Sequence, residues 1–161
     1  MSSRQPNLGA AFAELQAKLA ASPEVDARTG YSVASDDGVR IEALSPTRAP
    51  ALEDSLDDNA LVLRVSYGNI VFLLTSDLSV EGQQALVASG KDLRATALQV
   101  PHELDTDFAA AVQPSVAITQ AEYPNEDEMM ALDAGTLYRT ARDGTIHLSS
   151  DGISLWIGQD S

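Results

Sequence analysis

The chain of 161 residues contains no cysteine, only two lysines and 5% aromatic residues. The lack of cysteine excludes disulfides, zinc sites built on thiolates and thiol catalysis. Because aromatics are few while 44% of the residues are hydrophobic, the core must be mostly aliphatic. No apolar run approaches the roughly 20 residues of a membrane helix, and no signal-peptide core is present. We therefore expect a soluble chain, cytoplasmic as written, with its compartment otherwise open.

Positive charge is also scarce, since 10 Lys and Arg face 24 Asp and Glu, for a net charge of −14. Nucleic-acid binding depends on Lys and Arg that neutralise phosphates, and an acidic surface repels a phosphate backbone. We therefore expect no autonomous binding of DNA or RNA. The length suits one domain over residues 1–161, large enough to bury a core of its own.

The first third of the chain predicts little regular structure beyond a helix and a strand. Residues 8–21 place Leu and Phe side chains on one helical face, which predicts an N-terminal helix and linker over residues 1–30. A polar stretch then ends in an Asp-Asp-Gly turn before an alternating strand at 39–44. Residues 45–59 contain two prolines and many acids, and this composition is typical of an exposed loop.

The rest of the chain alternates strands with helices. Residues 61–65 and 70–74 predict a hairpin joined through 66–69, with its second strand buried on both faces. Such alternation predicts a layered α/β sandwich. The remaining predicted helices are 80–89, 106–112 and 126–134, and the remaining strands are 95–100, 116–119, 137–139, 145–148 and 153–157.

Two side chains with metal-binding chemistry follow buried strands. Asp77 comes after one strand and His102 after the next, so both should emerge at the carboxyl edge of the sheet, where many hydrolase metal sites are assembled. Simpler interpretations stay open, because Asp77 with Ser79 could cap the following helix and His102 could be a hydrogen-bonded turn residue. His147 is expected at the surface. The nucleophile elbow, the phosphate-binding loop and the dinucleotide fingerprint are absent from the sequence.

Several segments, taken in order, resemble a known family. They are DGVRIEALSP, DDNALVLRVSYGNIVFLLTSDL, LRATALQVPHEL, AVQPSVAIT and LYRTARDGTIHLSSDG. Together they resemble the later part of the metallo-β-lactamase-like domain of ComEC-type DNA-internalisation (competence) proteins, from about Phe12 to Ile157. The resemblance implies an αββα sandwich, of which this chain holds essentially the second half with an added N-terminal helix. It also implies one or two divalent metals, usually zinc or manganese, and a phosphodiesterase or nuclease activity.

The resemblance assigns roles to three residues. Asp77 matches the aspartate of the family's TGD motif, His102 matches the first histidine of its HHGS motif, and Glu103 offers a weak third ligand. The sequence departs from the pattern at Ser76, which replaces the motif's glycine, and at Glu103-Leu104-Asp105, which replaces the rest of HHGS. It also contains no HxHxDH, the motif of the first half that supplies most of the metal ligands.

These departures favour a degenerate, non-catalytic half-domain, because a catalytic zinc site normally needs three or more protein ligands. We expect no catalytic residue and no cofactor in the isolated chain, and we expect self-association or a partner half-domain. A second hypothesis is one half of a split metallohydrolase, which would bind zinc or manganese when a partner supplies HxHxDH. A third is an unrelated acidic α/β interaction module.

Overall fold

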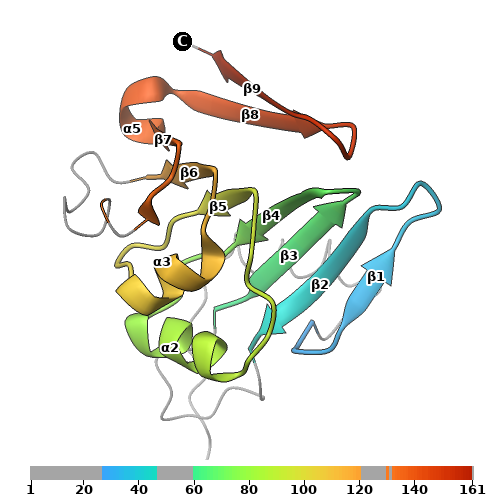
Figure 1. Cartoon of the computed structure of the whole chain (residues 1–161), viewed down its shortest axis with the longest axis vertical. Helices are drawn as coiled ribbons and strands as arrows, with labels where there is room; N and C mark the ends of the chain where they lie inside the picture. The colour runs from blue at the N-terminus through green and yellow to red at the C-terminus, as the bar shows by residue number, and fades with distance from the viewer. Residues whose placement is uncertain (1–26, 47–59, 121–129, 131, 161) are drawn as a thin grey trace, which may run out of the picture.

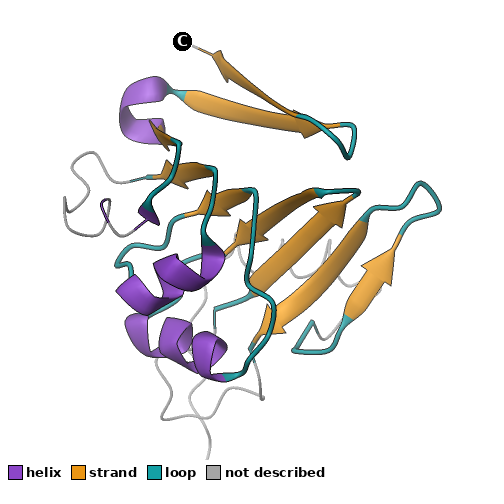
Figure 2. Ribbon diagram, viewed as in Figure 1, coloured by secondary structure: helices purple, strands orange, loops and turns teal. Residues whose placement is uncertain are grey.

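The computed structural model describes residues 27–46, 60–120, 130 and 132–160 (Figure 1). The predicted helix at 8–21, most of the predicted N-terminal linker, residues 47–59 of the predicted acidic loop and most of the predicted helix at 126–134 lie outside these residues. Figure 2 shows a structure that is mostly strand with few helices, which makes the fold mixed α/β of the α+β type.

The main sheet has seven strands in the order β1-β2-β3-β4-β5-β6-β7. Neighbouring strands from β1 to β4 are antiparallel, whereas those from β4 to β7 are parallel. Parallel neighbours need a crossover connection, which the helices provide. The strands are β1 Ser32–Ala34, β2 Arg40–Ser45, β3 Val62–Tyr67, β4 Ile70–Leu74, β5 Ala97–Gln99, β6 Val116–Thr119 and β7 Thr136–Arg139.

Two helices connect the parallel strands and pack on one face of the sheet (Figure 1). They are α2 (Val80–Ala88), between β4 and β5, and α3 (Thr106–Val112), between β5 and β6. Leu73 of β4 and Phe108 of α3 are fully buried in the core between helices and sheet. Among the described residues Phe108 is the one aromatic side chain of this core, which agrees with the aliphatic core expected from the composition.

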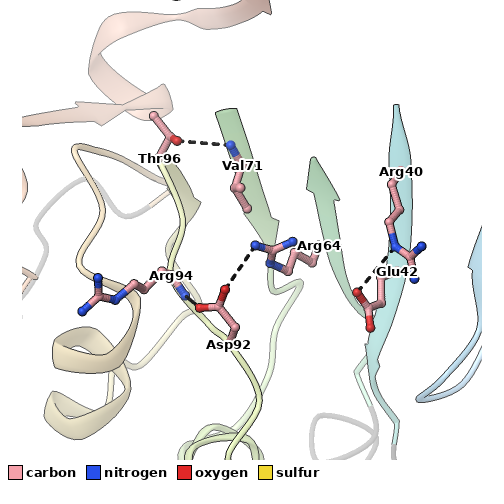
Figure 3. A network of polar contacts seen from close by, with 7 residues as sticks. All are labelled: Arg40, Glu42, Arg64, Val71, Asp92, Arg94 and Thr96. Atoms are coloured by element: carbon pink, nitrogen blue, oxygen red, sulfur yellow. Dashed lines mark hydrogen bonds and ion pairs between the residues drawn. The ribbon is translucent and has the colours of Figure 1, made fainter. Parts of the chain in front are cut away.

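Beside this core, polar side chains lie on the same face of the sheet over β2 and β3 (Figure 3). Arg64 of β3 lies next to Glu42 of β2 in the strand register and forms an ion pair with Asp92, with 3.5 Å between Nη2 and Oδ2. The other carboxylate oxygen of Asp92 accepts a hydrogen bond of 3.1 Å from the backbone N–H of Arg94. These contacts tie the loop between α2 and β5 to the sheet.

A separate hairpin lies on the other side of the sheet from α2 and α3 (Figure 1). It consists of β8 (Thr145–Ser150) and β9 (Leu155–Asp160), and it follows β7 through the short helix α5 (Thr140–Asp143). Its turn touches the turn between β3 and β4, where the Asn69 N–H donates a 2.7 Å hydrogen bond to the Gly152 carbonyl. The hairpin therefore covers the face that the helices leave open.

This cover is incomplete, because side chains on the sheet face opposite the helices are buried at one end of the strands and exposed at the other. Ile70, Ala97 and Val116 begin β4, β5 and β6, and all three are buried. At the carboxyl end of β4, by contrast, Leu74 is 40% exposed. The prediction that this strand is buried on both faces was wrong, because the hairpin covers only the amino ends of the parallel strands.

The structure also corrects several predicted boundaries. The polar stretch after residue 30 contains the edge strand β1, which no hydrophobic pattern announced. Ser45 is buried at the end of β2 rather than at the start of an exposed loop. The last predicted strand begins at Leu155 instead of Ile153, because Asp151 accepts hydrogen bonds from the backbone of Ile153 and Ser154 and so extends the turn.

Candidate site at the carboxyl edge of the sheet

Asp77 and His102 lie at the same edge of the sheet, as predicted. Asp77 follows the end of β4 by three residues, and His102 follows the end of β5 by the same number. Since β4 and β5 are parallel neighbours, their carboxyl ends meet, and both side chains line the same cavity.

Local hydrogen bonds fix the loop that carries Asp77. The buried Thr75 hydroxyl donates a 2.7 Å hydrogen bond to the Gln99 carbonyl, and this bond links the ends of β4 and β5. Ser76 then adopts φ = 52°, a left-handed conformation that glycine adopts far more readily than other residues. The chain turns sharply at Ser76 and thereby directs Asp77 away from the strand.

A buried side chain holds the two loops together. Gln83 of α2 is fully buried, and its side-chain NH₂ donates to the Leu78 carbonyl at 3.1 Å and to the Glu103 carbonyl at 2.8 Å. Its side-chain oxygen accepts from the Asp105 N–H at 2.9 Å. Leu78 adjoins Asp77 and Glu103 adjoins His102, so Gln83 sets the spacing of the candidate site.

Helix capping at this edge is done by residues other than Asp77. Ser79 caps α2, and its hydroxyl accepts a 3.1 Å hydrogen bond from the Gly82 N–H. Asp105 caps α3, and its carboxylate accepts a 2.9 Å hydrogen bond from the Phe108 N–H. The interpretation that Asp77 with Ser79 caps this helix is therefore confirmed for Ser79 and wrong for Asp77.

The cavity between these loops and the start of α2 has a volume of about 410 Å³. It is lined by Asp77, Leu78, Ser79, Val80, Glu81, His102 and Glu103. A smaller cavity of about 50 Å³ adjoins it, and Asp77 and His102 line both. Three carboxylates and no Lys or Arg line the larger cavity, so this edge favours cations and repels anions.

The three side chains that the resemblance assigned to a metal are all exposed. Within the described residues, no hydrogen bond or ion pair of the Asp77, His102 or Glu103 side chain is found. In the same part of the chain, no three His, Asp or Glu side chains are placed to hold a metal ion. Asp77 and His102 are thus available as ligands, but together with Glu103 they do not form a closed three-ligand site of the kind that zinc needs.

Comparison with family models, with curated proteins and with solved structures gives no match. No helix in the described part of the chain is long and apolar enough to cross a membrane.

Sequence reasoning missed two residues of this edge. Glu81 lines the cavity from the first turn of α2, and Gln83, two residues further along the same helix, positions both loops. Glu81 is recognisable as an acid near a helix start, where carboxylates are favoured. No sequence signal distinguishes Gln83 from its exposed neighbour Gln84. His147 is exposed on β8, as expected.

Proposed function

We propose that this chain is a degenerate, non-catalytic half of a metallo-β-lactamase-like domain, related to ComEC-type competence proteins, that acts by binding another protein chain. In this proposal the sheet with α2 and α3 forms one half of an αββα sandwich. The partner supplies a second half-domain that packs on the sheet face opposite the helices.

The observation that carries the proposal is the pairing of a partial metal site with an incompletely covered sheet. Asp77 and His102 meet at the carboxyl edge, and Ser76 holds the left-handed conformation that suits the glycine of the TGD motif. Next to this edge, Leu74 is 40% exposed, and Phe72 and Ile118 on the same face are only half-buried. Large apolar patches at a surface are typical of protein interfaces.

The first experiment tests association on this face. We expect the chain to bind a separately produced first half of a ComEC-type domain, and Leu74→Lys to weaken binding because it places a charge at the centre of the contact. The control is Ala88→Lys, which adds the same charge on exposed α2, on the opposite side of the sheet. Equal loss of binding in both variants, or no binding by the parent chain in calorimetry, would contradict the proposal.

A split metallohydrolase is the alternative function, and one observation favours it. The Asp77 and His102 side chains are exposed and unpaired within the described residues, so both are free to bind a metal ion together with ligands from a second chain. In that case, metal bound to the complex of the two chains would supply a hydroxide nucleophile.

Metal analysis separates the two functions. If the proposal holds, the chain alone retains no stoichiometric zinc or manganese, and adding it to the first half raises neither the metal content of that half nor its hydrolysis of bis-p-nitrophenyl phosphate. If the alternative holds, the complex binds metal and turns over substrate beyond what the first half does alone, and Asp77→Asn abolishes that gain. His102→Ala should likewise remove a metal ligand in the alternative. Its matched control is His147→Ala, which removes the other histidine and should leave the metal content unchanged.

A further inference from the structure

A separate cavity lies on the helix-covered face of the sheet, beside the loop between α2 and β5. It has a volume of about 220 Å³, and the described residues that line it are Glu42, Leu44, Arg64, Lys91 and Asp92. This volume is below the roughly 300 Å³ at which most ligand sites begin, so an occupant must be a small molecule. Two basic and two acidic side chains line the cavity, and their charges cancel at neutral pH.

Arg64 leaves most of its hydrogen-bonding capacity unused. Its side chain is only 20% exposed, although a guanidinium carries five N–H donors. In the described part of the chain its one polar contact is the 3.5 Å ion pair with Asp92, and its Nε is buried without a hydrogen-bond partner. The other oxygen of Asp92 already accepts from the Arg94 N–H, so Asp92 offers Nε no second acceptor. A buried donor without an acceptor is costly, and a ligand that supplies the acceptor removes that cost.

Glu42 has unused acceptors beside this unused donor. It is the direct neighbour of Arg64 in the strand register, and both side chains line the cavity. The two do not pair, because Arg64 extends away from Glu42 toward Asp92 while Glu42 lies near Arg40 (Figure 3). The Glu42–Arg40 ion pair spans 4.0 Å, which is beyond hydrogen-bond distance, so among the described residues the Glu42 carboxylate accepts no hydrogen bond.

These unused groups select a ligand that carries both charges. A carboxylate would accept hydrogen bonds from Arg64 and from Lys91, whose ammonium uses one of its donors for a 3.3 Å bond to the Leu44 carbonyl. An ammonium group would donate to Glu42. A simple anion would leave Glu42 unpaired and would approach a chain with a net charge of −14, whereas a simple cation would leave Arg64 unpaired. A small zwitterion avoids both costs.

We propose that this cavity binds a free α-amino acid with a small side chain, with its carboxylate on Arg64 and Lys91 and its ammonium group on Glu42. The cavity lies on the face that carries the helices, whereas the proposed function uses the opposite face around Leu74. Neither proposal therefore rests on the other.

NMR titration of the full chain with L-alanine tests the site. We expect saturable shifts of the Arg64 Nε–H signal and of the backbone amide signals of Glu42 and Lys91. Acetate and methylammonium each carry only one of the two charges. They should bind at least about tenfold more weakly than L-alanine, because each leaves a charged group of the cavity unpaired.

Variants test the assigned contacts. Arg64→Gln and Glu42→Gln should each weaken L-alanine binding about tenfold or more. Arg94→Gln is the matched control for Arg64→Gln, because Arg94 is exposed, does not line the cavity and directs its side chain away from Asp92 (Figure 3). Circular dichroism shows which variants are folded. If Arg64→Gln is not, Glu42→Gln decides, because it removes no hydrogen bond found among the described residues.

Three results would overturn the site. One is the absence of a saturable shift at these residues in the folded parent chain. Another is binding of acetate or methylammonium as tight as that of L-alanine, which would mean that the cavity recognises a single charge. The third is an equal loss of binding in Arg64→Gln and Arg94→Gln, which would reflect the net charge of the chain rather than a contact in the cavity.

Discussion

The side-chain NH₂ of Gln83 donates a 2.8 Å hydrogen bond to the carbonyl oxygen of Glu103, across 20 positions of sequence. This contact joins α2 to the loop after β5, which carries His102, and a second hydrogen bond from the same NH₂ to the Leu78 carbonyl reaches the loop after β4, which carries Asp77. The spacing of the candidate site thus depends on a residue that is fully buried and does not line the cavity.

We expect Gln83→Leu to lower the free energy of unfolding by about 2–4 kcal/mol, because it removes the partners of three backbone groups, whose hydrogen bonds to Gln83 are buried at Leu78 and partly buried at Glu103 and Asp105. Gln84→Ala is the matched control, since Gln84 is exposed and its change should stay within about 0.5 kcal/mol. Urea unfolding followed by circular dichroism gives both values. Equal effects of the two variants would mean that water replaces the Gln83 contacts without cost.

Ser76→Gly should stabilise the chain by about 0.5–1 kcal/mol, because glycine adopts φ = 52° without the steric cost that serine pays. The same change at Ser149, in extended β8, should destabilise, because glycine is unfavourable within a strand. Chemical denaturation of both variants tests the opposite signs. A loss of stability at both positions would show that the hydroxyl of Ser76 has a role of its own.

Regular elements with a strong local pattern could be predicted from the sequence. The hairpin of β3 and β4, the helices α2 and α3, and strand β6 agree closely with their predicted ranges, because apolar periodicity and turn residues mark them. Strand β1 could not be predicted, because its three residues are all exposed and carry no pattern; it is held by backbone pairing with β2 and by a 3.3 Å hydrogen bond from Arg40 to the Ser32 hydroxyl. Local pattern therefore succeeds where a side chain enters the core and fails where a strand pairs without burying one.

The site could be predicted in part for a related reason. Asp77 and His102 follow two strands in the same local pattern, and parallel pairing of those strands brings them to one edge. The role of Gln83 depends on three contacts with segments on either side of α2, and no single-sequence pattern contains that information. The exposure of Leu74 depends in the same way on how far the β8–β9 hairpin extends over the sheet.

The two leucines that end β4 should respond very differently to truncation. Leu73 is fully buried against the helices, and Leu73→Ala should cost about 2–5 kcal/mol in unfolding free energy because it leaves a cavity. Leu74 is 40% exposed on the other face, and Leu74→Ala should cost about 1 kcal/mol or less. Thermal and urea unfolding test the contrast. A cost at Leu74 as large as at Leu73 would mean that its face is covered in the isolated chain.

Acid should weaken the turn at the tip of the β8–β9 hairpin. Hydrogen bonds from the backbone N–H groups of Ser154 and Ile153 lower the pKa of Asp151 from its usual value. Because the pKa is lower in the folded state, this carboxylate stabilises the fold above its unfolded pKa, and the contribution is lost as pH falls through the folded pKa. Asp151→Asn should therefore show a smaller loss of stability than the parent between neutral pH and about pH 3. Identical pH profiles for the two proteins would exclude this contribution.

The contact between the β3–β4 turn and the β8–β9 turn gives the last prediction. Gly68 has φ = 55°, and a Cβ at this position would clash with the Gly152 carbonyl oxygen. Gly90 has a similar φ of 68°, but a Cβ there would meet nothing within 4 Å. Both changes to alanine should cost about 1 kcal/mol for the left-handed backbone, and Gly68→Ala should cost about 1–3 kcal/mol more because the two turns must separate. Hydrogen exchange should then show faster opening of β8 and β9 in Gly68→Ala alone. If the two variants are equally stable and exchange alike, the hairpin is not held against the sheet by this turn contact.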